Sequence, residues 1–350
     1  MISKPNDTNR WVKWWLLAGV VMVFVQILLG GITRLTGSGL SITRWDIVTG
    51  TLPPLNRVEW EEAFTLYKAT PQYQKINEGM ELSRFKFIFF WEYIHRLWAR
   101  SMGFVFLFPF VYFLYRGWLK KETIRRLMVV ILLAGLAALF GWIMVASGLI
   151  NRPWVSAYKL TIHLGLGISL FIFLAYTWIK EKGYTTIPVS KKWKNSLYWI
   201  IGLLIIQVCF GGFVSGMKSA LNYPTWPKMN GEWIPAILFD SSHWNMDSVL
   251  MYDQSGFMPA LVQFIHRNLA YLITLIGVVL SIKWINYQER KHSWVAYCLL
   301  GIIVVQVLLG ILTLIGSKGA IPLFYGAAHQ GVGILFLTYI MYINLKTSSK

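Results

Sequence analysis

The sequence is poor in charged residues and in cysteine. Only 14% of its 350 residues are charged, whereas 56% are hydrophobic and 16% are aromatic. This composition excludes a disordered chain, a coiled coil and a collagen-like fibre, and it argues against soluble domains. The two cysteines, Cys209 and Cys298, both lie within apolar runs, so no disulfide framework is indicated.

What the sequence has instead is a series of apolar stretches of about 20 residues, the length at which a helix crosses roughly 30 Å of hydrocarbon. These stretches predict an all-α integral membrane protein. Charges and clusters of Pro and Gly bound eight membrane-spanning helices at residues 11–33, 86–115, 125–148, 158–179, 195–217, 258–282, 294–316 and 323–345. A short amphipathic helix at the membrane interface is also expected over Arg57–Lys68.

The charges that are present are mostly basic: 33 Lys and Arg against 15 Asp and Glu give a net charge of +18. In a soluble protein this excess would suggest nucleic acid as a partner. Here most of the bases lie in short loops on one side of the predicted membrane, so lipid is the expected partner. The positive-inside rule places both termini in the cytoplasm. The segment before the first span is short for a transit peptide, which favours a bacterial cytoplasmic membrane.

The two halves of the chain resemble each other. Three motifs recur in the same order: LGGI at 29–32 as FGGF at 210–213, YIHR at 93–96 as FIHR at 264–267, and HLGLG at 163–167 as HQGVG at 329–333. Because each half contains four spans, the two copies should have the same orientation in the membrane. We therefore expect two four-helix bundles, residues 1–180 and 181–350, related by a pseudo-twofold axis along the membrane normal.

Four histidines lie inside the even-numbered spans, namely His95, His163, His266 and His329. Each is roughly five to ten residues from the outer end of its helix, so at 1.5 Å per residue all four lie at similar depth. Ionisable side chains within a span are costly to bury and usually have a function. Each half thus supplies two imidazoles from facing helices.

Two facing imidazoles are suited to heme, which needs one axial ligand on each side of the porphyrin plane and apolar walls. A tetrahedral zinc site would need further Cys, His or carboxylate ligands, and none recurs in both halves. Glycines two and four residues after His163 and His329 would let a flat macrocycle approach the backbone. Arg96 and Arg267 could reach a propionate. The alternative is that these histidines and glycines serve only helix packing.

The two halves differ beside these histidines. Glu92 lies three residues before His95, on the same helical face, whereas the corresponding residue of the second half is Gln263. A carboxylate one turn from an axial histidine could accept a proton or stabilise positive charge at the porphyrin periphery. This predicts a reactive heme site in the first half and a structural or electron-transfer heme in the second. The alternative is an intramembrane ion pair between Glu92 and Arg96.

The motifs as an ordered set resemble the heme A synthase family over nearly the whole chain. They are GGITRLT at 30–36 with GLS at 39–41, TGTLPP at 49–54, EYIHRLW at 92–98, VASGL at 145–149, TWP at 225–227 with WIP at 233–235, and QFIHR at 263–267. Some members of the family carry a cysteine pair in the first outer loop. Residues 34–85 contain no cysteine, so the chain resembles the cysteine-free subgroup.

The resemblance implies an enzyme that oxidises one methyl group of heme O to the formyl group of heme A by two successive hydroxylations, for use in terminal oxidases. It implies that His95 and His163 hold the substrate heme, with Glu92 as the catalytic acidic residue. It further implies that His266 and His329 are the axial ligands of a heme b cofactor. Heme O synthase and an electron donor or acceptor are the implied partners, and the oligomeric state is left open.

Two other classes fit the residues without the resemblance. The first is a diheme b-type cytochrome that carries electrons and leaves its hemes unmodified. The second is a heme-free transporter built from parallel repeats.

Overall fold

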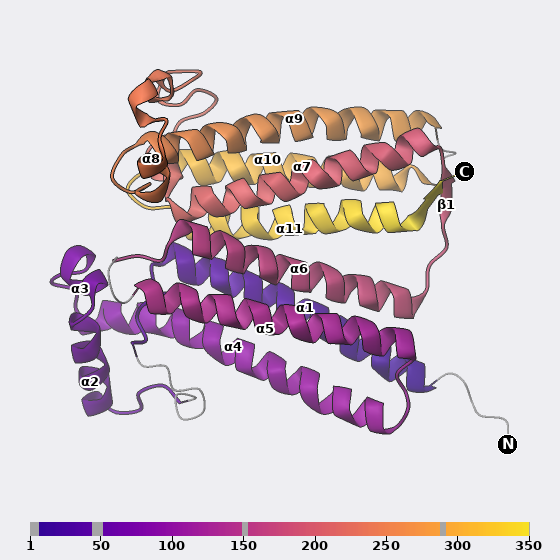
Figure 1. The fold of residues 1–350 in the computed structure, drawn as a ribbon, viewed down its shortest axis with the longest axis horizontal. Coiled ribbons are helices and arrows are strands. Elements are labelled where there is room, and N and C mark those ends of the chain that lie inside the picture. Colours follow the sequence, from indigo (N-terminus) through magenta and orange to yellow (C-terminus); the bar gives the residue numbers. More distant parts are fainter. Residues whose placement is uncertain (1–6, 44–51, 149–152, 288–291, 350) are drawn as a thin grey trace. The chain divides into compact units, whose positions relative to one another are not determined.

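The computed structural model describes residues 7–43, 52–148, 153–287 and 292–349. Within these ranges eight helices are long and apolar enough to cross a membrane (Figure 1). They are α1 (Asp7–Leu35), α4 (Leu82–Tyr115), α5 (Lys121–Gly148), α6 (Ala157–Lys182), α7 (Lys191–Gly216), α9 (Phe257–Tyr287), α10 (Trp294–Ile315) and α11 (Leu323–Lys346). The predicted all-α membrane protein with eight spans is confirmed, and the helix ends differ from the predicted ones by at most five residues.

The chain forms two compact units, Met1–Tyr184 and Thr185–Lys350, which we call the N-terminal and the C-terminal unit. In the N-terminal unit α1 packs against both α4 and α6, and α5 packs against α6. In the C-terminal unit α7 packs against α9 and α11, and α10 packs against the same two helices. Each unit is therefore a bundle of four long helices. The pseudo-twofold axis between the units stays a prediction.

Many large apolar side chains on the long helices are exposed, among them Phe108, which is 66% exposed, and Trp199, which is 76% exposed. In water such surfaces would drive association. In a bilayer they face hydrocarbon, where the helical backbone already satisfies its own hydrogen bonds. This distribution is that of a multi-pass membrane protein.

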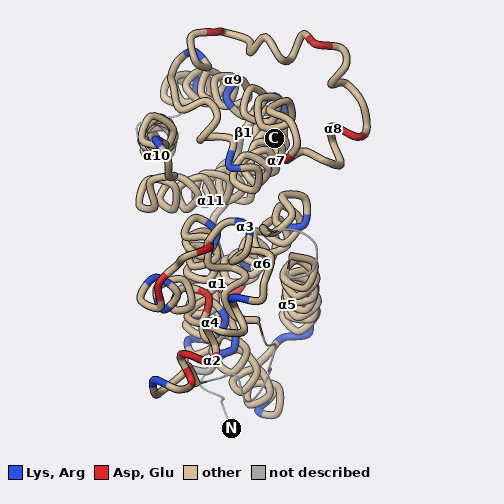
Figure 2. Tube along the Cα trace, turned by 90° about the vertical axis from the view of Figure 1, so that its left-hand side faces the viewer, with Lys and Arg blue, Asp and Glu red and all other residues tan. Residues whose placement is uncertain are grey.

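The connection between α1 and α4 contains the predicted short helix, α2 (Arg57–Lys68), followed by α3 (Pro71–Ile76). Asn56 caps α2 by accepting a hydrogen bond from the backbone N–H of Glu59. The helix carries acidic and basic positions together (Figure 2), while Phe64 and Tyr67 on its inner face pack against Phe85 of α4. The helix is confirmed at the predicted residues, and its place at the membrane interface stays a prediction.

The connection between α7 and α9 contains only short elements: η2 (Ser219–Leu221), η3 (Ala236–Phe239), η4 (Ser241–His243) and α8 (Met246–Leu250). At the other end of the C-terminal unit, β1 (Ile187–Val189) and β2 (Thr347–Ser349) form a parallel two-stranded sheet with Ile187 opposite Thr347. These strands tie the end of α11 to the start of α7.

Candidate functional site

The first histidine of each unit lies against a glycine of the preceding long helix. In the N-terminal unit His95 of α4 faces Gly30 of α1, and a Cβ atom built on Gly30 would lie 3.2 Å from His95 Nε2. In the C-terminal unit His266 of α9 faces Gly211 of α7, where the corresponding distance to His266 Cε1 is 3.3 Å. Because both spacings are tighter than ordinary carbon contacts, glycine lets each imidazole lie close to the neighbouring backbone.

The second histidine of each unit lies against a glycine in the same way, with less space still. His163 of α6 faces Gly141 of α5, and a Cβ atom on Gly141 would lie 2.9 Å from His163 Cε1. His329 of α11 faces Gly310 of α10, and the corresponding distance is 2.8 Å. Real Cβ atoms essentially never approach so closely. The same contact thus occurs independently in both units.

Hydrogen bonds fix the orientation of these two imidazoles. His163 Nδ1 lies 2.9 Å from the carbonyl oxygen of Ala137, and His329 Nδ1 lies 3.2 Å from that of Gln306. Since a carbonyl can only accept, Nδ1 carries the proton in both rings. Nε2 then has a free lone pair, which is the tautomer of a metal-binding histidine whose other nitrogen donates to a backbone carbonyl.

The two histidines of the C-terminal unit face each other, with ring centroids 6.4 Å apart and ring planes 76° apart. Two imidazoles that ligate one iron from opposite sides have centroids about 6 Å apart, because each metal–nitrogen bond is about 2 Å long and each centroid lies about 1 Å beyond its nitrogen. The pair therefore fits the axial ligands of a heme. His95 and His163 are the corresponding pair of the N-terminal unit, each against its facing glycine.

A glutamine on the first helix of each unit holds the helix that carries the first histidine. Gln26 Nε2 donates to the backbone carbonyl of His95 at 3.2 Å, and Gln207 Nε2 donates to that of His266 at 3.0 Å. Sequence reasoning missed both residues. The available signal was their spacing, since each precedes by four residues the glycine that faces the histidine.

Glu92 is buried, with 2% of its surface exposed, and its carboxylate is fully engaged. Oε2 accepts hydrogen bonds from Ser41 Oγ at 2.7 Å and from the backbone N–H of Ile42 at 2.8 Å, while Oε1 forms an ion pair with Arg96. Arg96 also donates to the carbonyl of Ile42 at 3.2 Å. The ion pair expected as an alternative to catalysis is therefore present, and it anchors the segment after α1 to α4, one turn from His95.

The equivalent position in the C-terminal unit has the same shape without the negative charge. Gln263 Nε2 donates to the carbonyl of Tyr223 at 3.2 Å, and Arg267 Nη2 donates to the same oxygen at 2.8 Å. Arg267 is 8% exposed and, among the described residues, takes part in no ion pair. Its buried guanidinium is held by carbonyl oxygens alone, whereas Arg96 is neutralised by Glu92.

Comparison with known proteins decides the family. The chain matches the sequence model of the COX15-CtaA family, described as cytochrome oxidase assembly protein, over residues 13–341. The chain belongs to this family. It is 38% identical over 344 residues to a protein of Bradyrhizobium diazoefficiens named heme A synthase, an alignment that covers 96% of this chain and 91% of the relative. Proteins of the same name from Brucella anthropi and Brucella ovis are 37% and 36% identical over 338 residues, again covering 96% of this chain and 92% of each relative.

Membership of the COX15-CtaA family confirms the resemblance inferred from the ordered motifs. The matched residues 13–341 include six of the eight long helices in full and most of α1 and α11, so they include both histidine pairs and the position of Glu92. The roles of the individual site residues stay predictions.

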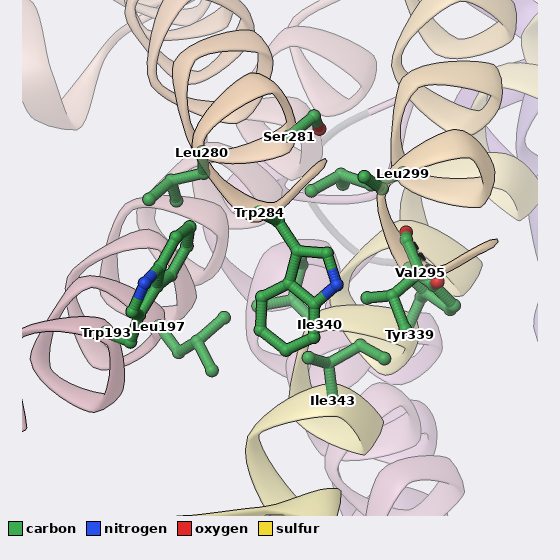
Figure 3. Close-up of a pocket in the computed structure, with 11 residues that line it drawn as sticks. Trp193, Leu197, Leu280, Ser281, Trp284, Val295, Leu299, Tyr339, Ile340 and Ile343 are labelled. Carbon is green, nitrogen blue, oxygen red and sulfur yellow. Dashed lines mark hydrogen bonds between the residues drawn. The ribbon is translucent and has the colours of Figure 1, made fainter. Parts of the chain in front are cut away.

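A small cavity in the C-terminal unit is separate from the histidine pair. It has a volume of about 20 Å³, room for about one water molecule. Figure 3 shows its apolar lining, with Trp193 and Trp284 among the residues that point into it. Trp193 lies near the start of α7 and Gly211 near its end, about 27 Å apart at 1.5 Å per residue. The cavity is thus too small and too distant to hold the heme that the histidines fit.

Proposed function

We propose that the protein is a heme A synthase, an integral membrane enzyme that oxidises one methyl group of heme O to the formyl group of heme A. The observation that carries this proposal is the pairing of half-buried histidines with facing glycines in each bundle, in a chain whose relatives over 96% of its length are named heme A synthase. The bound hemes would supply the redox chemistry of this reaction.

In this proposal each bundle has its own heme. His95 and His163, in the N-terminal unit, would bind the substrate heme O. His266 and His329, in the C-terminal unit, would hold a heme b cofactor through its iron. Each heme would be held by two imidazoles for which the facing glycines leave room, inside the spans of its bundle.

The difference in charge between the two units supports this division. Arg267 is a buried cation that lacks a carboxylate partner among the described residues, and a heme propionate would neutralise its charge. Arg96 is already paired with Glu92, so it would gain less from a propionate. A heme is therefore expected to be retained firmly in the C-terminal unit, as a cofactor requires. It is expected to exchange more readily in the N-terminal unit, as a substrate must.

We assign the catalytic role to Glu92, which lies one turn from His95 and whose equivalent in the other unit is the uncharged Gln263. Its carboxylate would accept a proton from the reacting substituent or stabilise positive charge that develops there. The hydrogen bonds from Ser41 and Ile42 hold the carboxylate in one orientation, which a charge-stabilising group needs.

We place the protein in a bacterial cytoplasmic membrane with both termini in the cytoplasm. Support comes from basic residues gathered at one end of each bundle, such as Arg125 and Arg126 at the start of α5 in one and Lys191 and Lys192 at the start of α7 in the other. Heme O synthase, as the source of the substrate, and an electron donor or acceptor are the partners that this reaction would use.

Co-expression with a source of heme O, followed by extraction and chromatography of the hemes bound to the purified protein, tests the function. Hydroxylated heme O and heme A are the expected products. If heme O is bound but recovered unaltered, the protein is a diheme electron carrier and the proposal is wrong.

A further inference from the structure

The two units differ at a second position beside the histidines, Ala137 in one and Gln306 in the other. The backbone carbonyls of both residues accept the Nδ1 hydrogen bond of the second histidine. Both residues also stand four positions before the glycine that faces this histidine, Gly141 or Gly310. Ala137 and Gln306 are therefore structural equivalents, and their side chains differ by a methylene and a terminal amide group.

In the C-terminal unit the side chain of Gln306 covers part of the helix that carries His329. Its Nε2 lies 3.0 Å from the place that a Cβ atom on Gly333 would take, and its Cδ lies at 3.7 Å. Gly333 is four residues after His329, on the same face of α11 and toward the middle of the span. The amide thus occupies the space one turn from the axial histidine. Its buried Oε1 has no hydrogen-bond partner among the described residues.

In the N-terminal unit the same space holds no such side chain. Ala137 ends at Cβ, and the residue equivalent to Gly333 is Gly167, four residues after His163. Among the described residues, a Cβ atom on Gly167 would have one neighbour within 4 Å, the Cγ1 atom of Ile27 at 3.8 Å. The N-terminal site is therefore roomier on the hydrocarbon side of His163 than the C-terminal site is beside His329.

Helix packing differs on the same side of the two units. In the C-terminal unit α10, which carries Gln306, packs against α9 as well as α11. In the N-terminal unit α5, which carries Ala137, packs against α6, whereas α4 and α5 do not form a packed pair along their described residues. The side of the N-terminal site that faces α5 is therefore covered by fewer packed helix pairs than the corresponding side of the C-terminal site.

We infer that Ala137 is a specificity-determining residue of the N-terminal site: its short side chain leaves room over Gly167 for the apolar isoprenoid tail of the substrate heme. Gln306 excludes such a tail from the C-terminal site, because it fills the same space and would place an unsatisfied amide against hydrocarbon. A heme without the tail fits there. This inference rests on the proposed function, since the tail is what distinguishes heme O from heme b.

The test is the substitution Ala137→Gln, which gives the N-terminal site the side chain that the C-terminal site has at position 306. The full-length variant is purified with heme b bound in the C-terminal site. Binding of added heme O and of added tail-free heme b to the N-terminal site is then titrated by absorption. Overfilling a packed site costs enough to weaken binding about tenfold or more. We expect this loss for heme O alone, with an equal rise in its KM and unchanged binding of heme b.

The matched control is Gln306→Ala, which should leave the preference of the N-terminal site unchanged and admit heme O to the C-terminal site. Equal weakening for both hemes by Ala137→Gln, or no weakening for either, would overturn the inference. The spectrum of heme b in the C-terminal site reports folding in every sample. If Ala137→Gln loses that spectrum, Ala137→Asn, whose side chain is one methylene shorter, is titrated with both hemes instead. Equal weakening for both hemes, or none for either, would again overturn the inference.

The outcome is separable from that of the proposed function. If the wild-type protein never oxidises heme O, the proposed function fails, whatever the titrations give. If Ala137→Gln oxidises heme O with the KM of the wild type, the inference about Ala137 fails and the proposed function stands.

Discussion

The substitution Gly310→Ala should release the heme of the C-terminal unit while leaving the bundle folded. A Cβ atom at position 310 would lie 2.8 Å from His329 Cε1, whereas ordinary contacts begin near 3.4 Å. The imidazole must therefore retreat by about 0.6 Å or the helices must separate. Overfilling a packed core costs about 1–3 kcal/mol, which corresponds to a loss of roughly five- to 150-fold in heme affinity if the strain falls on the bound state.

Heme content per polypeptide and the absorption spectrum of the purified variant measure this effect. We expect the C-terminal site to lose heme, or to keep it with His329 detached and the spectrum changed from six-coordinate to five-coordinate. Gly301→Ala on the same helix is the matched control, because a Cβ atom there has no neighbour within 4 Å among the described residues. A Gly310→Ala protein with the heme content and spectrum of the Gly301→Ala protein would refute the reasoning.

Three further predictions concern the charged groups beside the histidines. Glu92→Gln, which copies the other unit, should retain both hemes but abolish formation of the formyl group, as measured by chromatography of extracted hemes; substantial heme A from this variant would contradict the catalytic role. Ser41→Ala removes one hydrogen bond to the buried carboxylate of Glu92, and a bond of this kind is worth about 1.5–3 kcal/mol. Turnover should therefore fall about tenfold or more at unchanged heme content. An unchanged rate would show that this bond does not position Glu92. Gln263→Glu supplies Arg267 with a carboxylate, so this variant should release heme b to an acceptor protein faster than the control variant Gln263→Met does. Equal rates of heme release from the two variants would contradict the proposed contact between Arg267 and a propionate.

The spans and the histidine pairs could be predicted because their signals are local. A helix that crosses hydrocarbon needs about 20 apolar residues whatever its neighbours are, and His95 and His266 stand in nearly identical short motifs. The short helix at Arg57–Lys68 was also predictable, because its mixture of acidic and aromatic residues suits an amphipathic helix, and the structure has it at those residues.

The contacts around the histidines could not be predicted, because they depend on which helix faces which. The sequence drew attention to the glycines that follow His163 and His329 on their own helices. The glycines that contact the imidazoles instead lie on neighbouring helices, such as Gly141 and Gly310. The repeated spacing of Gln26 and Gly30 with Gln207 and Gly211 was visible, but only the fold shows that it serves to hold the histidines.

The asymmetry at Glu92 was predicted, whereas its consequence for charge was not. Sequence reasoning left catalysis and an ion pair with Arg96 as alternatives. The structure shows that the ion pair exists and that the same carboxylate also accepts from Ser41 and Ile42. Because both units anchor a loop at this position, the difference between them lies in charge and not in shape.

The heme content of four single variants, His95→Ala, His163→Ala, His266→Ala and His329→Ala, tests the central claim most directly. Pyridine hemochrome analysis and chromatography of the extracted hemes give the type and the amount bound to each purified protein. We predict that the variants at 266 and 329 lose heme b. We predict that those at 95 and 163 keep heme b with an unchanged spectrum but form no heme A. Full retention of heme b in the variants at 266 and 329, or its loss from the other two alone, would contradict the assignment of one heme to each histidine pair.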